Sequence, residues 1–415
     1  MEIKKIRQAV ILAGGYGTRL KPFTDTNPKP MYPFNGKPFL EYLIKQVKSF
    51  EIEEIVLLLG YLPEKIIDYF GDGSKWGIKI KYSVTPVEYE TGLRLLNGLE
   101  LYDDDFLFMY CDNYCPIDFK GLVLDYFRND ALIEFSAYEN KDNYTKSNLI
   151  IEEETGKVLT YDKKRTTPNL SGVDIGYALV NKEVFKYMPN ENENFEKIVY
   201  PKLVEEGKLY AKLTAHRYYS VGSYERIALT EEFFSNKKYM FIDRDGTINV
   251  RPQKARYIIE PEDFIWLPNA KEAIKKLVDN GYDLIMVTNQ AGIARGVMSI
   301  EQFEAINKKM NDDLGEYAIK HIYYCPHHWD EGCDCRKPKP GMFFKAQKDL
   351  NFDLTKCWML GDDERDMHAG ADAGCKCMMV STSHPLEEAV DYILKLEKEN
   401  DCQKNTFKNV VFWWW

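Results

Sequence analysis

The stretch VILAGGYGTRLKPFTDTNPKPM, residues 10–31, decides the fold of the first half of this chain. It opens within an apolar run at 9–12, which is short and β-branched enough to be a buried parallel strand. Glycines at 14, 15 and 17 follow, and they allow the sharp turn that brings backbone N–H groups close to an anion. Arg19 and Lys29 add positive charge beside this loop. A strand, a glycine loop and nearby cations together predict a triphosphate site.

The same string resembles the signature of the sugar-phosphate nucleotidyltransferases, the enzymes that make nucleotide sugars. The resemblance covers about residues 7–234. It implies that Arg19 and Lys29 are catalytic, with Arg19 on the leaving pyrophosphate, and that Asp112, after the apolar strand at 106–110, holds Mg²⁺. The residues implied for binding nucleotide or sugar are Leu12, Ala13, Gly14, Gly15, Gly17, Thr18, Thr91, Gly92, Gly176, Glu196 and Lys197.

Two positions depart from that family. Leu93 and Arg94 follow Thr91-Gly92 in place of small residues, and a simple turn before a helix explains this element equally well. Ser220 stands where the family usually carries a second metal-binding Asp, and a hydroxyl is a poorer Mg²⁺ ligand than a carboxylate. Either Asp112 and the phosphates hold the ion, or another acid substitutes, or the activity is altered.

The bulk composition limits the remaining classes. A chain of 415 residues predicts two domains, and its apolar content of 45% is enough for ordinary cores. We find no apolar leader and no long uncharged run, so we expect no signal peptide, no membrane span and a cytoplasmic enzyme. The net charge of −10 argues against a general nucleic-acid binder. The sequence leaves open whether the chain forms a homo-oligomer.

Apolar strand patterns alternate with helical patterns along the chain. In the first half, strands at 55–60 and 78–84 and helices at 36–50 and 63–70 predict a Rossmann-like α/β domain over residues 1–235. Its sheet should be largely parallel, with ligands at the carboxyl ends of the strands. A new strand near 239 predicts a second α/β domain over residues 238–390, followed by a charged tail over 391–415 that ends in three tryptophans.

The second domain opens with a strand that runs into Asp243-Arg244-Asp245-Gly246-Thr247. One carboxylate can attack phosphorus as a nucleophile, and a second carboxylate two residues on can move a proton. Later segments supply further polar groups for a phosphate site. They are Thr288 and Asn289 after the strand at 283–287, Arg295 on a glycine-flanked loop, Arg336 and Lys337, and Asp362 after the strand at 357–360.

Together these segments resemble the four motifs of the haloacid dehalogenase (HAD) phosphatases, over about residues 238–385. The resemblance implies a HAD-like Rossmannoid fold, with Asp243 as nucleophile and Asp245 as acid and base. It implies phosphate or substrate contacts from Thr288, Asn289, Arg295, Arg336 and Lys337, and Mg²⁺ at Asp243, Asp245 and Asp362.

A cysteine-rich loop lies between Asn289 and Arg336, and it ends just before Arg336-Lys337. Cys325, His327, Cys333 and Cys335 offer three thiolates and an imidazole, which suit a closed, structural, tetrahedral Zn²⁺ site. Beside the string CRKPKPGM, this loop resembles that of the D,D-heptose 1,7-bisphosphate phosphatases and, next, the histidinol-phosphate phosphatases. One position differs, because Asp363 stands where the heptose enzymes commonly carry Lys.

The two halves imply one bifunctional enzyme of nucleotide-sugar synthesis. A phosphatase would convert a heptose 1,7-bisphosphate into heptose 1-phosphate. A Mg²⁺-dependent nucleotidyltransferase, closest to the D-glycero-α-D-manno-heptose 1-phosphate guanylyltransferases, would join that product to an NTP and release pyrophosphate. The alternatives are another sugar or polyol phosphate with CTP, UTP or dTTP, or a first half that only binds a nucleotide sugar. Histidinol phosphatase is disfavoured because histidine synthesis does not explain the nucleotidyltransferase half.

Overall fold

The computed structural model describes residues 4–253 and 256–402, and the chain forms two compact units. The first comprises Met1–Glu232 and the second begins at Phe233. Helix α11 (Leu386–Cys402) runs through residue 391, where we expected a tail to begin. The rest of that tail, residues 403–415, lies outside the described residues.

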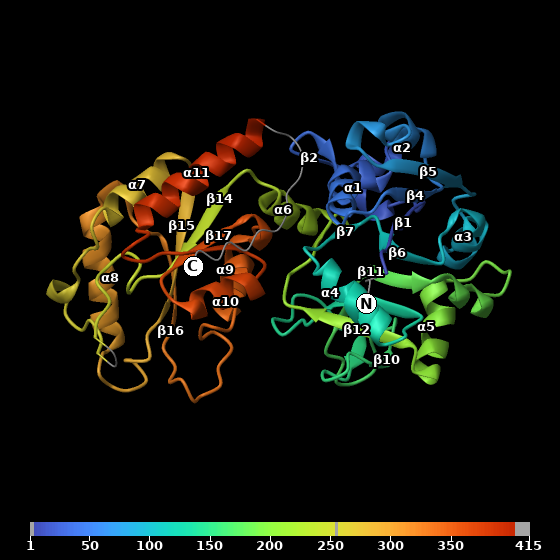
Figure 1. The fold of residues 1–415 in the computed structure, drawn as a ribbon. Helices are drawn as coiled ribbons and strands as arrows, with labels where there is room; N and C mark the ends of the chain where they lie inside the picture. The colour runs from blue at the N-terminus through green and yellow to red at the C-terminus, as the bar shows by residue number, and fades with distance from the viewer. Residues whose placement is uncertain (1–3, 254–255, 403–415) are drawn as a thin grey trace. The chain divides into compact units, whose positions relative to one another are not determined.

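A seven-stranded sheet forms the centre of the first unit (Figure 1). Its strands lie in the order β12 (Leu209–Thr214), β8 (Ile133–Tyr138), β11 (Val173–Asn181), β6 (Asp105–Tyr110), β1 (Gln8–Ala13), β4 (Glu54–Leu59) and β5 (Lys79–Val84). Only β11 runs antiparallel to its neighbours in this sheet. The largely parallel sheet that we predicted is therefore confirmed.

Helices and short strand pairs surround this sheet. The helices are α1 (Phe39–Ser49), α2 (Pro63–Phe70), α3 (Thr91–Asn97), α4 (Phe119–Arg128), α5 (Phe195–Glu206) and α6 (Tyr224–Phe233). The short strands are β2 (Pro33–Phe34), β3 (Lys37–Pro38), β7 (Asn113–Tyr114), β9 (Leu149–Ile151), β10 (Val158–Tyr161) and β13 (Tyr219–Ser220).

Strand β1 is buried on both faces, which explains its uninterrupted apolar sequence. Val10 and Leu12 join a core with residues of α3 and α5, whereas the alternate residues Ala9 and Ile11 are fully buried outside that core. Because β1, β4, β5 and β6 are parallel, the loops that follow them meet at one edge of the sheet. The glycine loop follows β1 at that edge.

The second unit has a five-stranded sheet in which every pair is parallel (Figure 1). The order is β16 (His321–Cys325), β15 (Tyr282–Asn289), β14 (Lys238–Ile242), β17 (Trp358–Gly361) and β18 (Lys376–Met379). The remaining helices of this unit are α7 (Ala270–Asp279), α8 (Ile300–Leu314), α9 (Gly341–Leu350) and α10 (Glu364–Asp372).

The central strand β14 divides the helices of this unit into two layers. Met240 and Ile242 pack in a core with residues of α7, α8 and α11, whereas Tyr239 and Phe241 pack in another core with residues of α9 and α10. A parallel sheet with helices on both faces confirms the α/β architecture expected of this half. The carboxyl ends of β14, β15 and β17 deliver Asp243, Thr288 and Asp362 to one edge.

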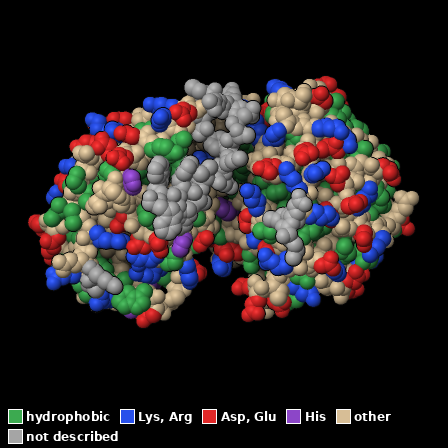
Figure 2. All heavy atoms as spheres, in the orientation of Figure 1, with side chains coloured by type: hydrophobic (Ala, Val, Ile, Leu, Met, Phe, Trp, Pro, Cys, Tyr) green, Lys and Arg blue, Asp and Glu red, His purple; other side chains and the backbone are tan. Residues whose placement is uncertain are grey.

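The surface carries charges of both signs. Figure 2 shows acidic and basic side chains interspersed over the drawn face of each unit. Across the described part of the chain, every helix is too short or too polar to span a lipid bilayer.

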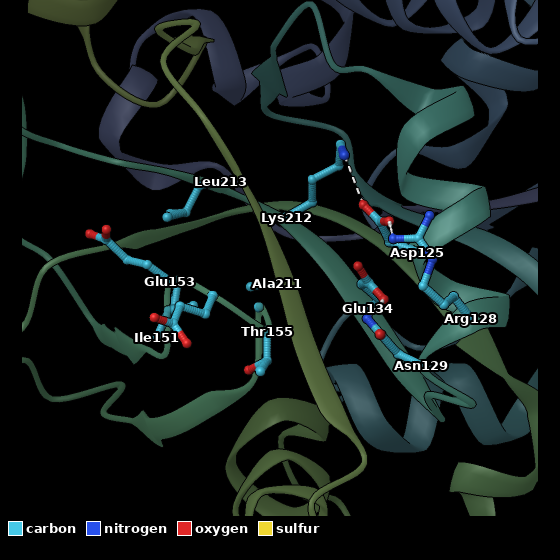
Figure 3. Close-up of a pocket in the computed structure, with 12 residues that line it drawn as sticks. Asp125, Arg128, Asn129, Glu134, Ile151, Glu153, Thr155, Ala211, Lys212 and Leu213 are labelled. Atoms are coloured by element: carbon cyan, nitrogen blue, oxygen red, sulfur yellow. Dashed lines mark hydrogen bonds and ion pairs between the residues drawn. The ribbon is translucent and has the colours of Figure 1, made fainter. Parts of the chain in front are cut away.

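A polar pocket of about 320 Å³ lies in the first unit, beside β8 and β12 (Figure 3). The described residues that line it are Asp125, Arg128, Asn129, Glu134, Ile151, Glu153, Glu154, Thr155, Gly156, Ala211, Lys212 and Leu213, and they include no predicted site residue. Glu134 is only 2% exposed, and Asn129 Nδ2 donates to its Oε2 at 3.1 Å. Burial raises the pKa of Glu134 from 4.5 to about 7.

Replacing Glu134 with glutamine should stabilise the protein at alkaline pH. Because the folded pKa lies above the unfolded value, the parent loses stability as pH rises from about 4.5 to about 7. We therefore expect Glu134→Gln to raise the free energy of unfolding at pH 8, by up to roughly 3 kcal/mol, and to change it far less at pH 5. Thermal unfolding at both values tests this, with the exposed Glu154→Gln as control. An equal shift at the two pH values would contradict it.

Candidate active sites

The glycine loop of the first unit leads from β1 to a cationic side chain. Gly17 has a φ of 65°, in the left-handed region that favours glycine, and it precedes a short 3₁₀ helix at Thr18–Leu20. A Cβ at Gly17 would lie 2.8 Å from Lys29 Cβ, so the loop and Lys29 pack in direct contact. The structure thereby brings together two parts of the predicted phosphate site.

Lys29 also reaches the predicted metal ligand. Its Nζ lies 2.7 Å from Asp112 Oδ2, although the two residues are 83 positions apart. Burial opposes ionisation of both groups, but their mutual attraction wins: the pKa of Asp112 is lowered and that of Lys29 is raised. Asp112 is therefore ionised near neutral pH and able to bind a cation, and the charge of Arg19 contributes to the lowered pKa.

Ser220 lies in the same corner of the unit. It pairs with Asn113 in the β13–β7 ladder, and the backbone N–H of Val221 donates to Asp112 O at 3.0 Å. A Cβ at Gly222 would lie 3.5 Å from Ser220 Oγ and 3.9 Å from Arg19 Nη2. The hydroxyl of Ser220 thus lies near Asp112 and Arg19, at the position where the resemblance implies a second carboxylate in the family.

The two segments predicted to contact the sugar touch each other. Thr91 Oγ1 accepts a hydrogen bond of 2.8 Å from the backbone N–H of Phe195, one residue before Glu196. Glu196 is buried, which raises its pKa to about 7, although Lys163 Nζ lies 3.0 Å from Oε2. Lys197 is exposed and pairs with Glu193 at 2.9 Å. Lys197 therefore lies on a solvated helix face, whereas Glu196 lies in the interior.

Gly92 and Gly176 are both needed for close packing. A Cβ at Gly92 would lie 2.5 Å from Glu193 O, and one at Gly176 would lie 2.9 Å from the ring of Tyr110. Gly176 also has a φ of 79°. Each glycine therefore lets two chain segments approach closely, and Gly176 does so against Tyr110 at the end of β6, two residues before Asp112.

Arg94, which departs from the family pattern, is a buried structural cation. It is 3% exposed, and its guanidinium donates to the carbonyls of Leu59, Pro86, Val87 and Tyr89 and to Thr85 Oγ1. A Cβ at Gly14 or at Gly60 would lie within 2.6 Å of this guanidinium. Arg94 therefore fills the space beneath the glycine loop and holds the loop after β5.

In the second unit, a buried lysine joins two carboxylates. Lys337 Nζ lies 2.6 Å from Asp243 Oδ1 and 2.6 Å from Asp366 Oδ1, and it donates to Val287 O at 2.7 Å. Burial would lower the pKa of Lys337, but the two carboxylates raise it, so the ammonium stays charged. Burial raises the pKa of Asp243 to about 7, and Lys337 opposes that rise.

Three carboxylates form a group that could hold a metal ion. Ligand atoms of Asp243, Asp362 and Asp366 all lie within 4.8 Å of one another. Asp362 Oδ1 is buried and has no hydrogen-bond partner within the described residues, as expected of an oxygen atom that binds a cation. This donor set of carboxylate oxygens suits Mg²⁺.

Asp245 lies outside that group, although we expected it to bind the metal. Its carboxylate accepts hydrogen bonds from Arg244, from Asn249 Nδ2 at 3.0 Å and from Gln290 Nε2 at 3.0 Å. These donors outweigh burial and hold the pKa of Asp245 below its usual value. The third carboxylate of the group belongs to Asp366.

Some of the residues predicted to contact phosphate lie in the interior of the second unit, and one lies at its surface. Asn289 clamps Lys337, since its Nδ2 donates to Lys337 O at 3.0 Å and its Oδ1 accepts from Lys337 N at 3.1 Å. Thr288 is buried, and its Oγ1 accepts from Gln290 Nε2 at 2.9 Å. Arg295 lies instead at the surface, with its guanidinium 5.6 Å from the ring centre of Trp329. Arg336 Nη1 is buried without a hydrogen-bond partner among the described residues.

The cysteine loop gathers all four of its predicted ligands. Sγ of Cys325 lies 3.6 Å from Sγ of Cys333 and 3.7 Å from Nδ1 of His327. Cys335 Sγ lies 3.6 Å from Cys333 Sγ and 3.2 Å from His327 Nδ1. A tetrahedral site with metal–sulfur bonds of about 2.3 Å has edges of about 3.8 Å between sulfurs. The cluster therefore has nearly the dimensions of a tetrahedral metal site.

We did not assign Gln290 from the sequence, and among the acids at 362–366 we singled out Asp362 and not Asp366. Asp366 follows Asp363, the first residue of a capping box at the start of α10, and this spacing could have marked it as a residue turned back toward the strand end. Gln290 directly follows Thr288-Asn289, but its contact with Asp245 depends on the pairing of β14 with β15.

Family models match both halves of the chain. Residues 8–235, more than half of the chain, match the nucleotidyl transferase model, and residues 173–374 match the haloacid dehalogenase-like hydrolase model. The two matches overlap, but the structure assigns β11 and the rest of the overlap up to Glu232 to the first unit.

Similar proteins agree with this division. The chain is 43% identical over 149 residues to a D-glycero-beta-D-manno-heptose-1,7-bisphosphate 7-phosphatase of Haemophilus ducreyi, a match of 34% of this chain and 80% of the relative. It is 38% identical over 164 residues to a D-glycero-alpha-D-manno-heptose-1,7-bisphosphate 7-phosphatase of Photorhabdus laumondii, a match of 37% of this chain and 88% of the relative.

A solved structure supports the fold of the other half. A candidate glucose-1-phosphate thymidylyltransferase of Bacillus anthracis aligns with a TM-score of 0.50 and 18% identity, over 54% of this chain and 94% of that one. At this identity the likeness concerns the fold alone. The family-model match and this likeness together identify the fold of the first unit. The chain therefore belongs to the nucleotidyl transferase family, and it joins that domain to a haloacid dehalogenase-like hydrolase of the family that contains the two phosphatases.

Proposed function

We propose that the chain carries out two consecutive steps of nucleotide-sugar synthesis on a heptose. The second unit removes the 7-phosphate of D-glycero-D-manno-heptose 1,7-bisphosphate, and the first unit joins the resulting heptose 1-phosphate to an NTP, with GTP as our first choice. The observation that carries this proposal is the 43% identity to a heptose-bisphosphate 7-phosphatase in a chain that also has a nucleotidyl transferase domain. The product of the first step is a substrate of the class that the second step needs.

In the phosphatase unit, the buried groups fit a phosphoryl transfer through the protein. An Asp243 oxygen attacks phosphorus, and the bond from phosphorus to the sugar oxygen breaks. The negative charge of the bound substrate phosphate opposes the lowering of the Asp245 pKa, so that Asp245 can give a proton to the leaving sugar oxygen and later take one from the attacking water. Lys337 neutralises charge at Asp243 and Asp366 and is held by Asn289. Mg²⁺ bound by Asp243, Asp362 and Asp366 would supply further positive charge for the phosphoryl oxygens.

In the nucleotidyltransferase unit, no covalent link to the protein is required. The sugar phosphate attacks the α-phosphorus of the NTP, and pyrophosphate leaves. Catalysis then depends on position and charge neutralisation. Loop N–H groups and Arg19 hold the pyrophosphate, and Lys29 stabilises the α-phosphate. Asp112 would bind Mg²⁺ together with phosphate oxygens, since Ser220 supplies no carboxylate.

We also propose that Cys325, His327, Cys333 and Cys335 bind a structural Zn²⁺. The donor set and its edge lengths support zinc, and four protein ligands leave no position for substrate. The loop ends one residue before Arg336-Lys337, so the metal would anchor the chain that presents Lys337. The eight cysteines in the described residues are free of disulfides, which fits a cytoplasmic enzyme.

Replacing the proposed nucleophile should separate the two activities. We expect Asp243→Asn to lose phosphate release from heptose 1,7-bisphosphate by roughly a thousandfold or more, because an amide oxygen is a far poorer nucleophile. Pyrophosphate release from heptose 1-phosphate and the productive NTP should persist in the same preparation. Assays with both anomers and each NTP separately measure this. Phosphate release at the parental rate would remove Asp243 from the mechanism.

The converse variant tests the first unit. Arg19→Ala should lower pyrophosphate release by roughly a hundredfold, because one cation is lost at the leaving group, while phosphate release continues. Lys21→Ala, two residues away and paired with Asp25, serves as the matched control. If the parent releases phosphate but no combination of sugar phosphate and NTP yields pyrophosphate, the first unit is a binding module and not a transferase.

Metal analysis tests the cysteine cluster. The purified parent should contain about one zinc per chain, and Cys335→Ser should lower the zinc content and the phosphatase kcat/KM together. Pyrophosphate release should remain. Cys375→Ala is the control, since Cys375 is a buried cysteine outside the cluster. Full phosphatase activity in a zinc-free parent would show that the loop needs no metal.

A further inference from the structure

Two arginines converge on Asp363 at the edge of the phosphatase site. Arg251 Nη2 donates to Asp363 Oδ2 at 3.0 Å, and Arg365 donates from Nε and Nη2 to the two oxygens of Asp363, each at 2.8 Å. Asp363 also caps α10 by accepting from the backbone N–H of Arg365. Asp363 therefore fixes both guanidinium groups.

This arginine pair lies beside the reacting groups. Arg251 Nη1 is 3.4 Å from Asp362 Oδ2, and ligand atoms of Asp362 lie within 4.8 Å of those of Asp243. Arg365 lies in the first turn of α10, the helix that also carries Asp366. Both cations therefore lie beside the group of carboxylates that includes the nucleophile.

Exposure distinguishes these arginines from Lys337. Lys337 is 3% exposed and already contacts two carboxylates and a carbonyl, so it serves the buried end of the site. Arg251 and Arg365 are 47% and 48% exposed. Each guanidinium has five N–H donors, and the contacts with acids use only some of them. The remaining donors are available to a ligand that enters from solvent.

The cluster keeps a net positive charge. Two arginines and one aspartate sum to one positive charge, and they present it as two planar groups. A planar guanidinium can bind phosphate through two parallel hydrogen bonds, which an ammonium cannot do.

We propose that Arg251 and Arg365, held by Asp363, bind the second phosphate of a sugar bisphosphate while the first phosphate lies at Asp243. The proposal rests on the proposed function, because it assigns the phosphate that the phosphatase does not remove. The subsite makes the enzyme select bisphosphates over monophosphates. Arg295, which the resemblance also assigns to the substrate, lies over the rings of Tyr257 and Trp329.

The test compares bisphosphates with the matching monophosphates. Parent, Arg251→Gln, Arg365→Gln and the double variant are assayed in the full chain with heptose 1,7-bisphosphate and heptose 7-phosphate, and with fructose 1,6-bisphosphate and fructose 6-phosphate. Lys345→Gln removes one positive charge from an exposed ion pair of the same unit and serves as control. The readout is the ratio of kcat/KM for bisphosphate to that for monophosphate, with kcat and KM separated.

We expect each single variant to lower this ratio roughly tenfold or more, through a higher KM for the bisphosphate, and the double variant to lower it further. Arg365→Gln is the more specific variant, because Arg365 pairs with Asp363 whereas Arg251 also contacts Asp362. An unchanged kcat/KM for the monophosphate confirms that the phosphatase unit of each variant is folded.

Other outcomes separate this inference from the proposed function. A parental preference for bisphosphates that survives in the double variant overturns the inference and leaves the proposed function standing. Equal loss on bisphosphate and monophosphate also overturns it, because the arginines would then act on the reaction centre. A preference that is seen only with fructose bisphosphate and is lost in the variants supports the inference and refutes the heptose assignment.

Discussion

The phosphatase half depends on the Lys337 ammonium, which lies between Asp243 and Asp366 in the interior of the second unit. Without this cation, two carboxylates would face each other in a buried space, and one of them would have to take up a proton. The ion cluster in turn determines what surrounds it. Asn289 must clamp the lysine backbone, and the cysteine loop must deliver the chain to that point.

The nucleotidyl transferase half has a similar pair of lysine and aspartate, whose side chains are more exposed than those of Lys337 and Asp243. Lys29 meets Asp112 at the carboxyl end of a parallel strand, as Lys337 meets Asp243. In each unit a lysine from a proline-rich turn neutralises an acid that a strand presents. The difference is the second carboxylate, because Asp366 completes the arrangement in one unit whereas Ser220 occupies the corresponding neighbourhood in the other.

Much of this arrangement could be predicted from the sequence, because apolar strands that end in glycines, acids or amides indicate the edge of a parallel sheet at which the active site lies. The confirmed α/β fold and the gathering of the four cysteine-loop ligands follow from such local patterns. The antiparallel direction of β11 could not be foreseen, since no local pattern encodes the direction of a strand relative to its neighbours. The contacts of Gln290 with Asp245 and of Arg251 with Asp363 join separate segments, so they became visible only in the folded chain.

The packing of Arg94 against the glycine loop has an evolutionary consequence. Gly14 and Gly60 look like residues chosen for backbone freedom or for a phosphate, yet the Arg94 guanidinium occupies the space where a Cβ at either position would lie. Each of the three residues therefore limits what the other two can become. A larger residue at Gly14 would be tolerated only after Arg94 had been shortened, and shortening Arg94 would first remove its hydrogen bonds to carbonyl groups at the end of β4 and in the loop after β5. The three positions form an epistatic unit, so they should change together or not at all.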